Sequence, residues 1–152
     1  MSYTTGEGRE RILADVATAT DELALAVAAL GEAYEELDEQ TADRLEEELF
    51  RPAQLAYGRL RRTHAEFAGR HGLTARSFER STGGLHSADP RVYVERAIEA
   101  IERADQAIAE LQDSMLPVEV GDRELREGLS EVRETIAELP ARARRLMRAQ
   151  GR

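Results

Sequence analysis

The sequence contains no cysteine and no tryptophan, and it also lacks lysine. Without cysteine the chain can form no disulfide, no thiolate-bound metal centre and no cysteine nucleophile. A cysteine-free chain is typical of a reducing compartment, so we expect a cytoplasmic protein. No segment approaches the roughly 20 consecutive apolar residues that a membrane-spanning helix requires, and no membrane association is expected.

All 21 basic residues are arginine, and with 30 acidic residues they give a formal net charge of −9. This negative balance argues against general nucleic-acid binding. The exclusive use of arginine, together with abundant alanine, has two interpretations. It indicates either the codon bias of a GC-rich genome or selection for the bidentate anion contacts that arginine makes better than lysine.

The length of 152 residues fits one domain and is sufficient for a sizeable apolar core. We assign that domain to residues 9–150. Residues 1–8 have neither the basic region nor the apolar run of a signal peptide, and they are expected to form a short flexible tail.

Apolar residues recur every three or four positions in four long segments, and no segment has the alternating pattern of a strand. This periodicity predicts helices over residues 10–39, 41–71, 90–116 and 122–148. Asp89 and Asp122 directly precede two of these segments and are expected to cap them. Pro52 and Pro140 lie inside predicted helices, where each should remove a backbone hydrogen bond and cause a kink.

The connections between these helices predict the architecture. Very short links join the first helix to the second and the third to the fourth, which favours antiparallel neighbours. The connection over residues 73–89 is long. We therefore predict an all-α protein, an antiparallel up-down-up-down four-helix bundle with a long loop between helices two and three. The alternative is a pair of helical hairpins that dimerise to complete one core.

In that topology the charges separate along the bundle. Acids gather near the turn after the first helix, whereas arginines gather where the second and fourth helices end and in the long loop. Favourable interaction with helix dipoles explains part of this pattern. The functional interpretation is an anion-binding end, which would bind a small anion or an acidic protein through Arg62, Arg70, His71, Arg76, Arg80, His86, Arg142 and Arg145.

Residues 23–31 carry no polar side chain on any face of the first helix. A helix that is apolar all round should be buried on more than one side. We therefore predict a homodimer interface in this segment, formed by Leu25, Ala26 and Ala29.

Patterns of catalytic or metal-binding residues are missing. The three histidines do not follow a glutamate at the spacing of a di-iron bundle, so neither a metal nor a cofactor is expected. The long loop offers hydroxyls, a Gly-Gly pair and His86, but it lacks a phosphate-binding loop or a nucleophile elbow. Phe78 and Leu85 could instead hold this loop over the open end of the core.

The sequence therefore does not establish a function. The leading hypothesis is a non-enzymatic helical protein-interaction module that acts as a homodimer. The alternative is a protein that binds a small phosphate- or carboxylate-bearing molecule at the arginine-rich end.

Overall fold

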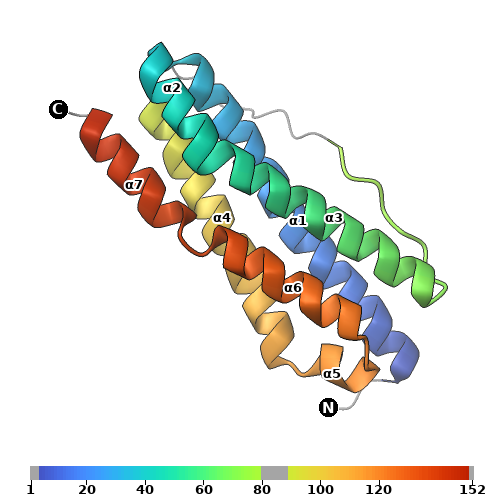
Figure 1. The fold of residues 1–152 in the computed structure, drawn as a ribbon. Helices are drawn as coiled ribbons and strands as arrows, with labels where there is room; N and C mark the ends of the chain where they lie inside the picture. The colour runs from blue at the N-terminus through green and yellow to red at the C-terminus, as the bar shows by residue number, and fades with distance from the viewer. Residues whose placement is uncertain (1–3, 80–88, 151–152) are drawn as a thin grey trace.

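A computed structural model describes residues 4–79 and 89–150, and within these ranges every regular element is helical. The prediction of an all-α protein is confirmed (Figure 1). None of the described helices is both long and apolar enough to cross a membrane. The elements are α1 (Thr5–Glu35), α2 (Glu39–Leu45), the π-helical turn η1 (Glu46–Phe50), α3 (Arg51–Arg70), α4 (Pro90–Asp113), α5 (Leu116–Val120), α6 (Arg123–Ile136) and α7 (Leu139–Gln150).

Helix α1 begins at Thr5, so residues 5–8, which were predicted to be a flexible tail, are helical. The reason is a capping box. The hydroxyl of Thr4 accepts a hydrogen bond from the amide of Glu7 at 3.1 Å, and the Glu7 carboxylate accepts one from the amide of Thr4 at 3.1 Å. This reciprocal pair satisfies amides that have no partner inside the helix.

Helices α2 and α3 follow one another through η1 without a break, and Pro52 explains the π-helical turn. Proline has no amide hydrogen for the carbonyl of Glu48 four residues earlier, and its ring would collide with that carbonyl in a regular helix. The wider turn just before Pro52 relieves this conflict. Arg142 Nη1 of α7 donates to the Glu48 carbonyl at 3.3 Å, so a second helix satisfies the group that proline left free.

The second internal proline divides the predicted fourth helix. Helix α6 ends at Ile136 and α7 begins at Leu139, with Pro140 in its first turn. The predicted cap of α6 is confirmed, since the Asp122 carboxylate accepts from the Leu125 amide at 2.9 Å.

The predicted third helix ends earlier than expected, at Asp113. Its predicted cap is confirmed, because the Asp89 side chain accepts from the amide of Arg91 at 3.0 Å. Beyond Asp113 the chain turns through Met115, which has a left-handed backbone with φ of 66°. The short helix α5 follows and contains Pro117.

The predicted up-down-up-down order is wrong, because α3 and α4 run in the same direction (Figure 1). Helix α1 is antiparallel to α3 through a tight turn. It is also antiparallel to α4, because the start of α1 at Gly8 lies against Leu116, just beyond the end of α4. Helix α6 is antiparallel to α3, since Arg70 and Arg59 contact Asp122 and Glu131 respectively. The helices therefore run up, down, down and up.

The long connection between α3 and α4 makes this order possible. An extended chain covers at most about 3.3–3.6 Å per residue, so residues 73–89 could reach on the order of 55 Å. Helix α4, with 24 residues, is roughly 36 Å long. A connection of this length can join opposite ends of the helices, whereas the prediction assumed that it joined the same end.

The apolar segment of α1 is buried inside the molecule, which contradicts the predicted dimer interface. Ala26 and Ala29 belong to the core, and only Leu25 remains exposed, at 41%. The physical reason is the close packing of α1 against α4, the most extensive helix pair in the described structure. Both helices bring small side chains to the core, namely Ala19, Ala26 and Ala33 of α1 and Ala97, Ala100 and Ala104 of α4.

Candidate functional site

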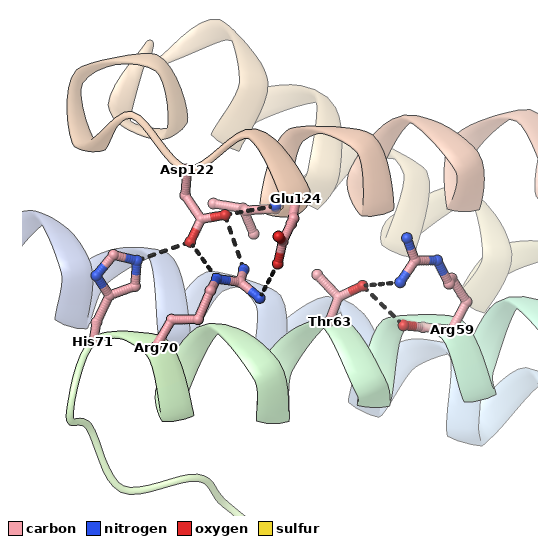
Figure 2. Close-up of polar contacts among 7 residues, drawn as sticks. Arg59, Thr63, Arg70, His71, Asp122 and Glu124 are labelled. Carbon is pink, nitrogen blue, oxygen red and sulfur yellow. Dashed lines mark hydrogen bonds and ion pairs between the residues drawn. The ribbon is translucent and has the colours of Figure 1, made fainter.

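A polar seam joins the end of α3 to the start of α6 (Figure 2). Asp122, which is buried, lies at its centre. Arg70 donates to both carboxylate oxygens, from Nε at 3.0 Å and from Nη2 at 2.8 Å, and His71 Nε2 lies 2.8 Å from Oδ2. Arg70 also pairs with Glu124 at 2.8 Å.

The charged state of Asp122 is stabilised by these contacts. Burial alone would raise the pKa of this carboxyl group. Hydrogen bonds from the Leu125 amide, His71 and Arg70 outweigh burial and hold the pKa below its usual value. Because the carboxylate is fully engaged, it fixes the α3–α6 junction and offers no free oxygen for acid–base chemistry.

Further along the same seam, α3 and α6 approach very closely. Arg59 Nε donates to Glu131 at 2.8 Å, and the Thr63 hydroxyl donates to the Arg59 carbonyl at 2.9 Å. A Cβ atom at Gly128 would lie only 2.5 Å from Thr63 Oγ1, so this position requires glycine. The seam is therefore built for packing as well as for ion pairing.

The second notable feature is His64 on α3, which is 1% exposed. Its Nδ1 is buried and has no hydrogen-bond partner among the described residues. Burial, and secondarily the charge of Arg76, lower the pKa of this imidazole, which is therefore neutral near pH 7. Phe78 packs its ring against His64 edge-to-face, with the ring centroids 4.9 Å apart. Of the two residues that were expected to hold the loop over the core, Phe78 thus contacts His64, and Leu85 lies outside the described residues.

The eight predicted ligand-binding residues do not form one cluster. Arg70 and His71 lie at the end of α3 that contacts the start of α6, and their polar atoms are occupied by Asp122. Arg142 and Arg145 lie on α7, whose final residue Gln150 contacts Thr41 of α2 at 3.0 Å, at the opposite end of the molecule.

Two of the four remaining predicted residues lie within the described ranges. Arg62 is exposed on α3, and Arg76 follows α3 and pairs with Asp21 of α1. Arg80 and His86 lie outside the described residues. Because α3 and α4 are parallel, the arginines of α7 reach the acidic α1–α2 end, so the predicted division into an acidic and a basic end does not occur.

The surface that the fold leaves unexplained is the outer face of α3. Leu55 is 71% exposed, more than any other large apolar side chain in the described structure. It lies on a stripe with Arg51, Gly58 and Arg62, and residues 49–65 contain no acid. No prediction from the sequence pointed to this face.

Metal binding finds no support in the described part of the chain, where no three histidine or acidic side chains are grouped so as to hold an ion. Comparison with known proteins gave no match to a family model, to a curated protein or to a solved structure. The function must therefore be inferred from the geometry of the described residues.

Proposed function

We propose that the protein is a non-enzymatic helical interaction module that works as a homodimer, with residues 39–70 of two copies packed antiparallel. We infer that each copy is a four-helix bundle. Its four helices are α1, the continuous helix α2–η1–α3, α4, and the pair α6–α7. The observation that supports this proposal most strongly is the self-complementary outer face of α2, η1 and α3, with Leu55 near its centre.

Charge along this helix changes sign near its middle. The first part contains five acids, namely Glu39, Asp43, Glu46, Glu47 and Glu48, with Arg44 as its one base. The following part contains Arg51, Arg59, Arg61 and Arg62 and no acid before Glu66. Two such helices that pack antiparallel around a two-fold axis place the acidic part of one against the basic part of the other.

The register follows from placing the axis close to Leu55. Leu55 then contacts its own counterpart, and Glu47 of each copy lies opposite Arg62 of the other. Both side chains are exposed, and neither takes part in a salt bridge with any residue of the described ranges. Each is therefore available for a partner.

Gly58 and Gly69 lie on the same stripe, and their lack of a side chain would let the backbones of the two copies approach closely. A Cβ at Gly69 would meet nothing within 4 Å, and one at Gly58 would meet only the end of Arg62 at 3.7 Å. Each exposed helical glycine costs about 1 kcal/mol relative to alanine. The packing of the single chain does not explain this cost, whereas a second helix packed against the stripe does. The helix over residues 39–70 is roughly 48 Å long, enough for an interface of standard size.

The test is a charge-reversal cycle measured by sedimentation equilibrium. Glu47→Arg and Arg62→Glu should each raise the dimer dissociation constant by about tenfold, because each change creates two repulsive contacts per dimer. The double variant should restore the wild-type constant, since both pairs are then re-formed with opposite sign.

Two controls match the change in net charge. Glu119→Arg on α5 and Arg126→Glu on α6 alter exposed residues away from this face and should leave dimerisation unchanged. Leu55→Asp should abolish the dimer without altering the fold. A wild-type protein that is monomeric up to millimolar concentration would contradict the proposal, and so would a double variant that remains as weak as the single ones.

A further inference from the structure

A pocket of about 560 Å³ lies between α1, the second half of α3 and the segment that follows α3. We call residues 73–79 of that segment the strap. The apolar wall of the pocket is formed by Leu13, Ala14, Ala17 and Leu73, and its polar groups belong to Glu10, Thr18, His64, Thr74 and Arg76. This size and this mixture of walls suit a small organic ligand.

His64 supplies hydrogen-bonding capacity that the fold does not use. The great majority of buried polar atoms in proteins have a partner, and an exception calls for an explanation. Here Nδ1 has none, although the ring is almost completely buried on the pocket wall. The imidazole is neutral, so it can donate one hydrogen bond without placing a charge in the core.

The strap itself covers this ring with an aromatic group. Phe78 contacts His64 edge-to-face, and the guanidinium carbon of Arg76 lies 4.5 Å from the centroid of the Phe78 ring. Phe78 is half-buried and belongs to no helix. The chain thus shows which group fits against His64, namely an aromatic ring next to an arginine.

Hydrogen-bond donors predominate beside this ring. Among the described residues, Arg76 pairs with Asp21 through Nη2, and its other N–H groups are available. The Thr74 hydroxyl has no partner among the described residues, whereas the Thr18 hydroxyl already donates to the Ala14 carbonyl. Of the described residues on the lining, only Glu10 is acidic. Arginine with neighbouring donors is the usual partner of a carboxylate.

We propose that this pocket binds a small aromatic carboxylate, whose ring replaces that of Phe78 against His64 and whose carboxylate pairs with Arg76. The ligand lies against the apolar wall of Leu13 and Leu73, and the Phe78 side chain turns away from His64 to admit the ligand ring, while Leu73 and Arg76 keep their places on the lining. Because Phe78 occupies the place against His64, the ligand ring must displace the Phe78 ring before it can contact the imidazole. This site is separate from the outer face of α3 and does not depend on the proposed dimer.

The experiment measures binding of phenylacetate by calorimetry, with phenylacetamide and benzylamine as matched neutral and cationic probes. Phenylacetate should bind, and the two other probes should bind at least about tenfold more weakly, because they cannot form the charge-assisted pair with Arg76. Phe78→Ala should tighten phenylacetate binding about fivefold or more, since it removes the internal competitor. The imidazole NMR signals of His64 should shift on binding.

Arg76→Gln should weaken phenylacetate binding about tenfold, whereas Arg126→Gln, which changes an exposed arginine of α6 outside the pocket, should have no effect. Circular dichroism would verify that each variant is folded. Three results would overturn the proposal: no binding of phenylacetate to the Phe78→Ala variant at millimolar concentration, preference for benzylamine, or unchanged binding in the Arg76→Gln variant.

Discussion

Replacing Asp122 by alanine should weaken the junction between α3 and α6 and lower the stability of the whole chain. The substitution removes the cap of α6, which contributes about 1 kcal/mol. It also leaves Arg70 and His71 without their carboxylate partner. Truncating one member of a fully buried ion pair costs about 3–5 kcal/mol. Arg70 keeps Glu124 at 2.8 Å, and its side chain is 30% exposed, so we expect a smaller penalty, roughly 1–2 kcal/mol.

The total, about 2–3 kcal/mol, is a large fraction of the stability of a single domain. At about 2–4 °C per kcal/mol it corresponds to a fall of roughly 5–10 °C in Tm. Urea unfolding followed by circular dichroism gives the free energy directly. Asp122→Asn is the informative comparison, because asparagine caps a helix as well as aspartate does but carries no charge. It should lose only the part due to Arg70 and His71.

The difference between wild type and Asp122→Asn should also depend on pH. The folded pKa of Asp122 lies below its ordinary value of 3.8. A carboxyl group of this kind contributes stability that is fully present above 3.8 and is lost as the pH falls through the lower folded pKa. The two proteins should therefore converge in strong acid. If Asp122→Asn is as stable as wild type at pH 7, the charge of this carboxylate does not hold the two helices together.

Three further substitutions test the packing and the backbone. Gly128→Ala should destabilise the protein by about 1–3 kcal/mol, because its Cβ would lie 2.5 Å from Thr63 Oγ1. Gly31→Ala is the control, because the nearest atom to its added Cβ would be 3.9 Å away, and it should stabilise the protein by about 0.5–1 kcal/mol. If chemical unfolding gives equal effects for the two substitutions, the close contact at Gly128 is refuted. Met115→Gly should raise stability by up to about 1 kcal/mol in the same assay, since the left-handed backbone at φ 66° strains methionine and its side chain is 51% exposed. A loss of stability instead would show that the Met115 side chain has a packing role that its exposure conceals.

The sequence predicted part of the arrangement around α3 and missed the rest. The basic character of α3 and the aromatic residue Phe78 in the segment after it were recognised, because charge runs and isolated aromatics in a loop are visible without coordinates. The contacts of Arg70 and His71 with Asp122 were not. These residues lie on segments whose spatial relation depends on how two distant helices pack. The burial of His64 was not predicted either, because the strap that buries it follows α3 in a path that no local pattern encodes.

The sequence by itself determined the helical class, the two aspartate caps and the positions where proline distorts or divides a helix. Each of these depends on interactions within a few residues, so local periodicity and backbone chemistry are sufficient. Only the tertiary structure decided the direction of α4, and with it which charges meet. A long connection permits either direction, so the choice depends on side-chain packing across the whole core. The alanines of α1 and α4 fit together there, and this packing buries the segment of α1 that had been predicted to bind a second copy.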